Sequence, residues 1–132
     1  MADPDKILLV EDSEPLRKVL SEKLRDEEFL VYEAGGGEEG VRMAEESRPD
    51  LILTDIVMFP IDGVEMARRI RESGEFGRNV HIIALTNQND AEEHARIEPL
   101  HFTDYLVKAD TGLDEVVKRV KEILRGKKAH TK

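Results

Sequence analysis

The sequence predicts an α/β fold of the flavodoxin-like class, a three-layer sandwich in which five helices cover a five-stranded parallel sheet of order 2-1-3-4-5. Five short apolar runs alternate with segments whose apolar residues recur at helical spacing. These runs show no alternation with polar residues, which is typical of strands covered on both faces. Right-handed crossovers in so short a chain favour an order in which the first and third strands are neighbours.

Each predicted strand is an apolar run that stops at a polar residue or at a glycine-rich turn. The five runs lie at residues 6–10, 29–34, 51–54, 80–85 and 105–107. Four of them are followed by a residue whose side chain can react or bind an ion, in the chain order Glu11, Asp55, Thr86, Lys108. The second run ends at Gly35, where three glycines predict a turn rather than a phosphate loop, because no lysine follows and two glutamates would repel an anion.

The first two helices are marked by a cap and by apolar spacing. Ser13 and Pro15 predict the start of the first helix, which is expected to run to about Asp26. The second passes through Val41, with Gly40 in its interior, where glycine costs about 1 kcal/mol relative to alanine.

The next two helices are bounded by glycine and proline. A helix is expected over residues 64–72, and Gly74 with Gly77 predicts a loop after it. A polar helix opens at Asp90 and closes at Pro99.

The last helix begins at a predicted Thr111 cap, and its buried stripe ends at Leu124. A chain of 132 residues is one domain by size. We therefore predict a single domain over residues 1–132, with its core at about 6–124 and a polar tail over 125–132 that frays from Gly126.

Composition excludes several classes of function. A net charge of −9 argues against direct DNA binding by the domain and suits a basic partner or a cation. The absence of cysteine excludes thiol catalysis, disulfides and cysteine-ligated metals. No apolar run approaches the roughly 18 residues of a membrane span, and the acidic start lacks the order of a secretory signal. We therefore expect a cytoplasmic protein that does not insert into a membrane.

The predicted strand order brings reactive side chains to one edge of the sheet. Three carboxylates, Glu11, Asp12 and Asp55, would repel each other there, and a proton or a divalent cation relieves that repulsion. Mg²⁺ fits, because it takes one or two carboxylates and favours a phosphate as a further ligand. If Asp55 attacks phosphorus to form an acyl phosphate, Lys108 is a suitable counter-charge and the Thr86 hydroxyl a suitable donor.

This set of residues resembles the receiver domain of two-component response regulators, and in its length a stand-alone receiver of the chemotaxis-regulator kind. The resemblance covers about residues 6–124. The matching motifs are Ile7–Asp12, Asp55 with Met58 and Asp62–Gly63 downstream, Ile83–Thr86 and Tyr105–Lys108.

The resemblance implies a phosphoacceptor site. In it, Asp55 accepts a phosphoryl group from a histidine kinase or a histidine phosphotransfer protein. Glu11, Asp12, Asp55 and the backbone carbonyl of Val57 hold Mg²⁺ (or Mn²⁺), and Lys108 pairs with the phosphate. The chain would then be a signalling protein rather than an enzyme, assisting only its own phosphotransfer and dephosphorylation.

The resemblance also implies a switch. Thr86 moves toward the phosphate as Tyr105 turns inward, and the surface of the family's helix 4, strand 5 and helix 5 changes for a downstream protein target. Whether the domain dimerises on phosphorylation is left open by the sequence.

Several positions depart from the family pattern. Ala109 replaces the usual proline, often cis in the family, so we expect a trans or rearranged bond, because a non-proline cis bond costs about 2.5–4 kcal/mol. Phe59 places a bulky apolar side chain at the site mouth, as a candidate partner contact. Asn87 replaces a small residue and is expected to crowd the path of the neighbouring threonine. Val57 and Gln88 supply no obvious carboxylate or amine to direct water at phosphorus, so we expect a long-lived phosphoryl group.

Three other classes of function compete with a phosphoacceptor switch. A flavin-binding electron carrier needs an anion-welcoming loop after the first strand, whereas residues 11–14 are acidic. A phosphohydrolase with an aspartyl nucleophile commonly needs a second acid at the position of Val57. A phosphorylation-independent, receiver-like binding module stays open because of Ala109. Among the remaining polar residues, Arg71 and its neighbouring arginines are expected to be solvated, and His94 to lie on a helix surface.

Overall fold

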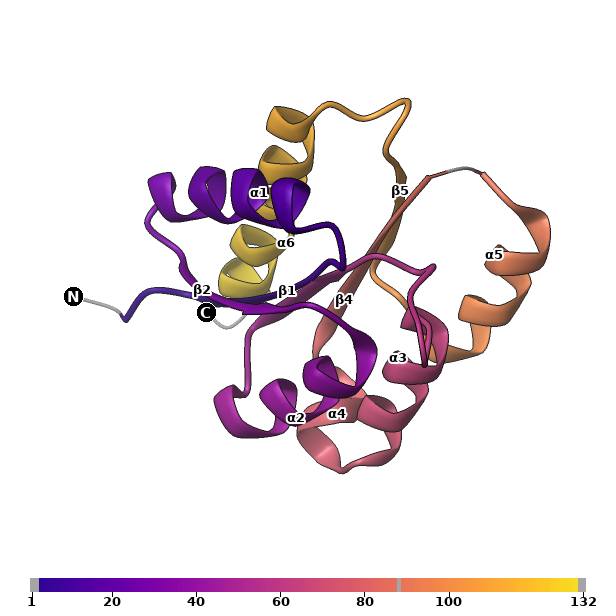
Figure 1. Ribbon diagram of the computed structural model, residues 1–132. Helices are drawn as coiled ribbons and strands as arrows, with labels where there is room; N and C mark the ends of the chain where they lie inside the picture. The colour runs from indigo at the N-terminus through magenta and orange to yellow at the C-terminus, as the bar shows by residue number, and fades with distance from the viewer. Residues whose placement is uncertain (1–2, 88, 131–132) are drawn as a thin grey trace.

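In the computed structural model, which describes residues 3–87 and 89–130, five parallel strands form one sheet in the order β2-β1-β3-β4-β5 (Figure 1). The strands are β1 (Lys6–Val10), β2 (Leu30–Ala34), β3 (Leu51–Thr54), β4 (His81–Thr86) and β5 (Asp104–Val107). Val10 pairs with Thr54, and Thr54 pairs with Ala84, so the carboxyl ends of β1, β3 and β4 lie at one edge. The predicted fold class and strand order are confirmed. Strand ends differ from the prediction by one residue at most.

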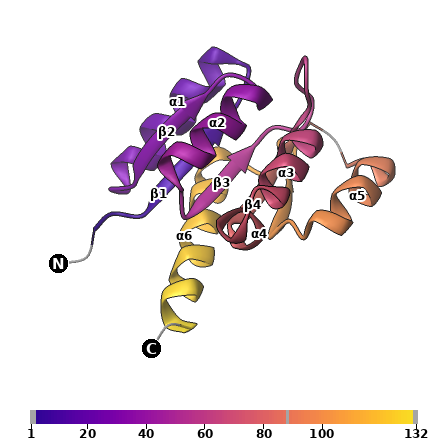
Figure 2. The same ribbon diagram turned by 90° about the horizontal axis from the view of Figure 1, so that it is seen from below.

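Helices cover both faces of this sheet, as predicted. They are α1 (Glu14–Asp26), α2 (Gly37–Ser47), α3 (Gly63–Glu72), α4 (Glu75–Asn79), α5 (Ala91–Ile97), the 3₁₀ helix η1 (Glu98–Leu100) and α6 (Leu113–His130). α1 and α6 lie on one face and α2, α3 and α4 on the other, while α5 lies toward the β5 edge (Figures 1 and 2). The five longer helices correspond to the five predicted ones.

The central strands β1, β3 and β4 are mainly apolar because each face of the sheet meets its own helix layer. Alternate residues of β1 point to opposite sides of the sheet: Ile7 packs in the cluster that contains Leu20 of α1 and Val120 of α6. Leu8 packs in the cluster that contains Ile70 of α3. Burial on both faces therefore explains the absence of polar alternation in the sequence.

The prediction of a loop after α3 is wrong, because residues 75–79 form the short helix α4. Gly77 makes this possible: a Cβ there would lie 1.7 Å from the backbone oxygen of Ile70, so only glycine lets α4 pack on the end of α3. Gly40 has a similar reason, since a Cβ would lie 2.6 Å from the Met66 sulfur at the contact of α2 with α3.

The start and end of α6 also differ from the prediction. The helix begins at Leu113, so Gly112 rather than Thr111 directly precedes it. At the other end it runs to His130, past the expected fraying point at Gly126. Within residues 3–87 and 89–130, no helix is long and apolar enough to cross a membrane.

Candidate functional site

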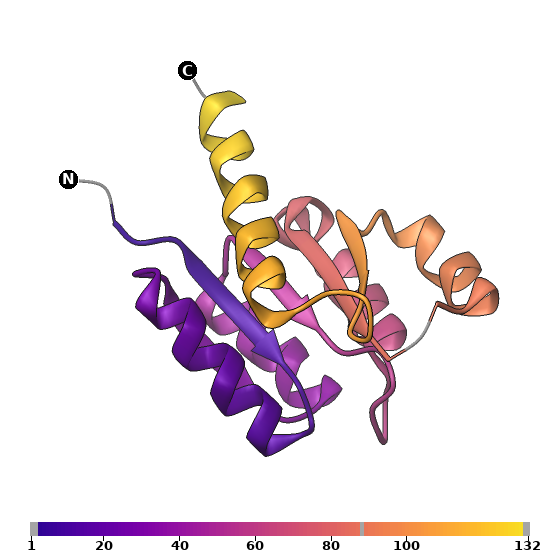
Figure 3. The ribbon, with the colours of Figure 1, turned by 90° about the horizontal axis from the view of Figure 1, so that it is seen from above.

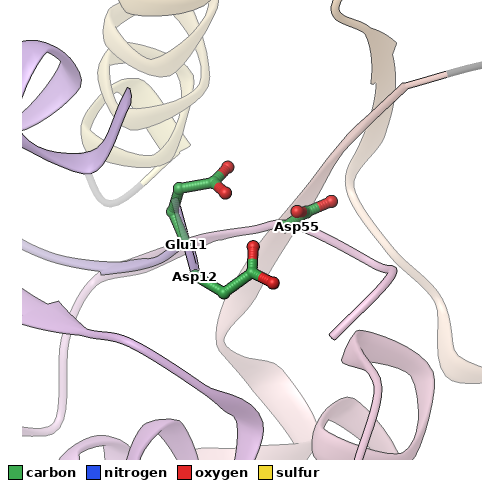
Figure 4. A group of neighbouring side chains, drawn as sticks. All are labelled: Glu11, Asp12 and Asp55. Atoms are coloured by element: carbon green, nitrogen blue, oxygen red, sulfur yellow. The ribbon is translucent and has the colours of Figure 1, made fainter. Parts of the chain in front are cut away.

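Three carboxylates converge at the carboxyl edge of the sheet (Figure 4). Glu11 and Asp12 directly follow β1, and Asp55 directly follows β3. One carboxylate oxygen from each lies within 4.8 Å of the others, a spacing that can hold a metal ion. The backbone is held there by sheet-like hydrogen bonds: the N–H of Asp55 donates to the Val10 carbonyl at 2.9 Å, and that of Glu11 donates to the Ala34 carbonyl at 3.1 Å.

Asp55 is a nearly buried carboxylate, with 4% of its surface exposed. Its Oδ1 accepts the backbone N–H of Ile56 at 2.8 Å, and its Oδ2 lies 3.5 Å from the Lys108 ammonium. Burial, followed by repulsion from Glu11, raises the pKa of Asp55 from 3.8 to about 6, and the opposing attraction of Lys108 is too small to cancel them. Near neutral pH the carboxylate is thus ionised in surroundings that favour an added positive charge.

Lys108 is shared between two carboxylates. Its Nζ donates to Glu11 Oε1 at 3.1 Å and lies in ion-pair range of Asp55. The Lys108 backbone N–H donates to the Thr86 carbonyl at 2.7 Å, which ties the end of β5 to the end of β4. Among the described residues, the one cis peptide bond joins Phe59 to Pro60 in the loop after β3. The Lys108–Ala109 bond is therefore trans, in agreement with the expectation from the sequence.

Thr86 is the last residue of β4, and Tyr105 is the second residue of β5. Thr86 is buried, and Tyr105 is half-buried. The Tyr105 hydroxyl donates to Glu93 Oε1 at 2.6 Å, and its ring stacks on His94 with the centroids 3.7 Å apart. Burial and then the Glu93 carboxylate raise the pKa of Tyr105 to about 12, while a side-chain hydrogen bond from Thr86 acts in the opposite direction.

Comparison with known proteins decides the family. Residues 7–121 match the response regulator receiver domain. This chain belongs to the receiver domain family of response regulators. A phosphoacceptor role in signalling follows, and receivers in general pair with histidine kinases and bind Mg²⁺.

Two response regulators are similar to this chain in sequence. The chain is 36% identical over 121 residues to the transcriptional regulatory protein AfsQ1 of Streptomyces coelicolor, covering 90% of this chain and 51% of that protein. It is 36% identical over 120 residues to ResD of Bacillus subtilis, covering 91% and 48%. This receiver domain therefore spans about half the length of these relatives.

Solved structures show the same fold. The chemotaxis response regulator CheY4 of Vibrio cholerae superposes with a TM-score of 0.82 at 26% identity, covering 91% of this chain and 98% of that one. The N-terminal domain of a Wolinella succinogenes protein superposes with a TM-score of 0.84 at 29% identity, covering 95% and 98%.

The loop that follows Asp55 in this receiver domain carries two solvent-facing apolar side chains. Val57 is 54% exposed and Phe59 is 85% exposed. Figure 3 shows the segment between β3 and α3 projecting from the edge of the sheet. The Phe59 side chain is therefore free to contact a partner, whereas its expected place at the mouth of the site stays a prediction. Gln88, paired with Val57 in the expectation about phosphoryl lifetime, lies outside the described residues.

Arg71 of the receiver domain has a structural role that the sequence analysis missed, so its assignment as a solvated surface residue is corrected. Its guanidinium donates to the carbonyls of Leu100 (2.8 Å), Gly77 (2.8 Å), Val80 (2.7 Å) and His101 (3.2 Å). Burial lowers the pKa of Arg71. The side chain thereby joins α3 to α4 and to the segment that follows α5.

Asp62 is the second residue whose contacts were missed. Its Oδ1 accepts the N–H of Glu65 at 2.9 Å and caps α3, while its Oδ2 accepts from Arg96 of α5 at 2.8 Å. The Asp62–Gly63 pair before an apolar helix is a readable capping signal, but the link to α5 has no counterpart in the local sequence.

Proposed function

We propose that Asp55 accepts a phosphoryl group from the phosphohistidine of a histidine kinase or of a histidine phosphotransfer protein. The observation that carries this proposal is a buried carboxylate in ion-pair range of Lys108 and beside two further carboxylates. An Asp55 oxygen attacks phosphorus, the P–N bond to the donor histidine breaks, and the imidazole keeps the electron pair and takes up a proton. The product is an acyl phosphate on Asp55.

The excess of negative charge favours a divalent cation. Glu11, Asp12 and Asp55 carry three carboxylates against the single ammonium of Lys108. Together with the Val57 backbone carbonyl they form the proposed ligand set for Mg²⁺ (or Mn²⁺), whose preferred ligands are oxygens. Bound there, the ion supplies positive charge against the carboxylates and the phosphoryl oxygens.

Two protein groups are placed to stabilise the phosphoryl oxygens. Lys108 already lies 3.5 Å from Asp55 Oδ2, so a small movement away from Glu11 brings its ammonium to a phosphoryl oxygen. Thr86 supplies a hydroxyl donor from the end of β4. Ala109, which motivated the alternative of a phosphorylation-independent binding module, does not keep Lys108 out of the pocket.

In the proposed function, phosphorylation of Asp55 changes the surface that a downstream protein binds. The family's helix 4, strand 5 and helix 5 correspond here to α5, β5 and α6, because α4 is an additional short helix. We propose that a downstream protein reads this surface after Thr86 and Tyr105 rearrange, with dimerisation as one form of that output. The chain turns over no substrate besides its own phosphoryl group, so it acts as a signalling protein.

Intact mass spectrometry after incubation with acetyl phosphate tests the proposal. The wild type should gain one phosphoryl group in the presence of Mg²⁺, and should gain none with a chelator. Asp55→Asn should gain none under either condition. A wild type that never gains mass, or an Asp55→Asn protein that gains as much as the wild type, would overturn the assignment of Asp55.

A further inference from the structure

α5 is attached to the rest of the domain by few side chains. Ile97 is its one buried residue. Two polar ties lie one turn apart on the helix: Glu93 accepts from Tyr105, and Arg96 donates to Asp62. Figures 1 and 3 show α5 at the β5 edge of the molecule. Because so little apolar surface anchors it, the position of α5 depends strongly on these ties.

The Tyr105 hydroxyl lies between the end of β4 and α5. It donates to Glu93 Oε1 at 2.6 Å. His94, the residue after Glu93, stacks on the ring and restricts its orientation. The strand that carries Tyr105 leads directly to Lys108, whose ammonium lies 3.5 Å from Asp55 Oδ2. Strand β5 and the Tyr105–Glu93 hydrogen bond therefore connect the Asp55 site to the first turn of α5.

We propose that Glu93 is a positioning residue that transmits the state of Asp55 to α5 by anchoring the helix to the Tyr105 hydroxyl. The inference rests on the proposed function, because it takes phosphorylation of Asp55 as the event that displaces Thr86 and Tyr105. Glu93 itself touches neither the carboxylate group nor Lys108. When the Tyr105 hydroxyl moves, its hydrogen bond to the Glu93 carboxylate moves α5 with it.

The two ends of α5 differ in their attachment, which determines where the movement occurs. Beyond the C-terminal end, the carbonyls of Leu100 and His101 are held by Arg71, and Ile97 is buried. The N-terminal half is held by the short, charge-assisted bond between Tyr105 and Glu93, a directional contact. Phosphorylation therefore displaces the first turn of α5 more than its last turn.

Backbone amide NMR shifts of residues 91–97, measured before and after phosphorylation with acetyl phosphate and Mg²⁺, test this inference. Glu93→Ala and Tyr105→Phe each remove the hydrogen bond, so the phosphorylation-induced shifts in α5 should fall to about half or less of the wild-type values. Glu93→Gln keeps an acceptor oxygen and should retain them. Glu92→Ala, an exposed neighbour on the same helix, is the matched control and should change nothing.

The outcomes separate this inference from the proposed function. A wild type that is not phosphorylated overturns both. If all variants are phosphorylated, the Lys108 amide shifts in each, and α5 responds in Glu93→Ala and Tyr105→Phe as it does in the wild type, the role of Glu93 is refuted while Asp55 keeps its function. Loss of the α5 response in Glu93→Gln equal to that in Glu93→Ala would also refute it, because a hydrogen-bond acceptor would then not be the relevant property.

Discussion

Replacing Asp55 with asparagine should stabilise the metal-free protein at neutral pH. The folded state raises the pKa of Asp55 from 3.8 to about 6, a difference of roughly 2 units at 1.36 kcal/mol each, or about 3 kcal/mol. This net cost already includes the attraction to Lys108, and asparagine, which does not ionise, removes it. We therefore expect Asp55→Asn to raise the free energy of unfolding by about 1–3 kcal/mol.

The sign of the pH dependence follows from the direction of the shift. Because the folded protein binds the Asp55 proton more tightly than the unfolded chain does, the Asp55 contribution to stability falls as pH rises from about 4 through about 6. Above that range the cost is constant. Asparagine does not titrate, so the difference between variant and wild type should be small at pH 4 and reach its full value by pH 7.5.

Urea unfolding followed by circular dichroism, in the presence of a chelator, measures this difference at both pH values. Asp3→Asn, which neutralises an exposed carboxylate far from the site, is the control and should match the wild type. Added Mg²⁺ should narrow the gap, because it binds the folded wild type more tightly than the variant. A variant no more stable than the wild type at pH 7.5, or a gain that is the same at both pH values, would refute the electrostatic reasoning.

Four further predictions follow from the contacts described. Lys108→Gln should slow phosphorylation by acetyl phosphate about 100-fold, measured by intact mass, since it removes the counter-charge on the phosphoryl oxygens; an unchanged rate would contradict the assigned role. Arg71→Ala should lower the free energy of unfolding by about 2–4 kcal/mol, because four backbone carbonyls lose their donor, three of them in partly buried hydrogen bonds. Arg68→Ala should lower it by under about 1 kcal/mol, since the ion pairs of Arg68 are exposed, and equal losses in the two variants would contradict this prediction. Phe59→Ser should leave the free energy of unfolding within about 0.5 kcal/mol of the wild type, because the side chain is 85% exposed, and a larger loss would show a packing role. The phosphoryl group on Asp55 should persist for minutes or longer in Mg²⁺ buffer, and decay within seconds would refute that expectation.

The sheet and the position of the site could be predicted from the order of residues along the chain. Apolar runs without alternation specify strands buried on both faces, and parallel strands bring their carboxyl ends to one edge. For this reason Glu11, Asp55, Thr86 and Lys108 could be placed together from their positions at strand ends alone. Short-range signals such as Ser13 before Pro15 likewise predicted the start of α1, since a cap depends on residues three positions apart.

The tertiary structure decided features that depend on segments far apart in the chain. Arg71 is a half-buried donor because segments in and after α4 and η1 present their carbonyls to it, up to 30 residues away. The ties of Glu93 to Tyr105 and of Arg96 to Asp62 join residues 12 and 34 positions apart. The raised pKa of Asp55 likewise depends on burial and on Glu11, which no local pattern encodes. Local periodicity specifies which face of an element is buried, whereas the contacts that adjust charge and couple helices exist only after the layers have packed.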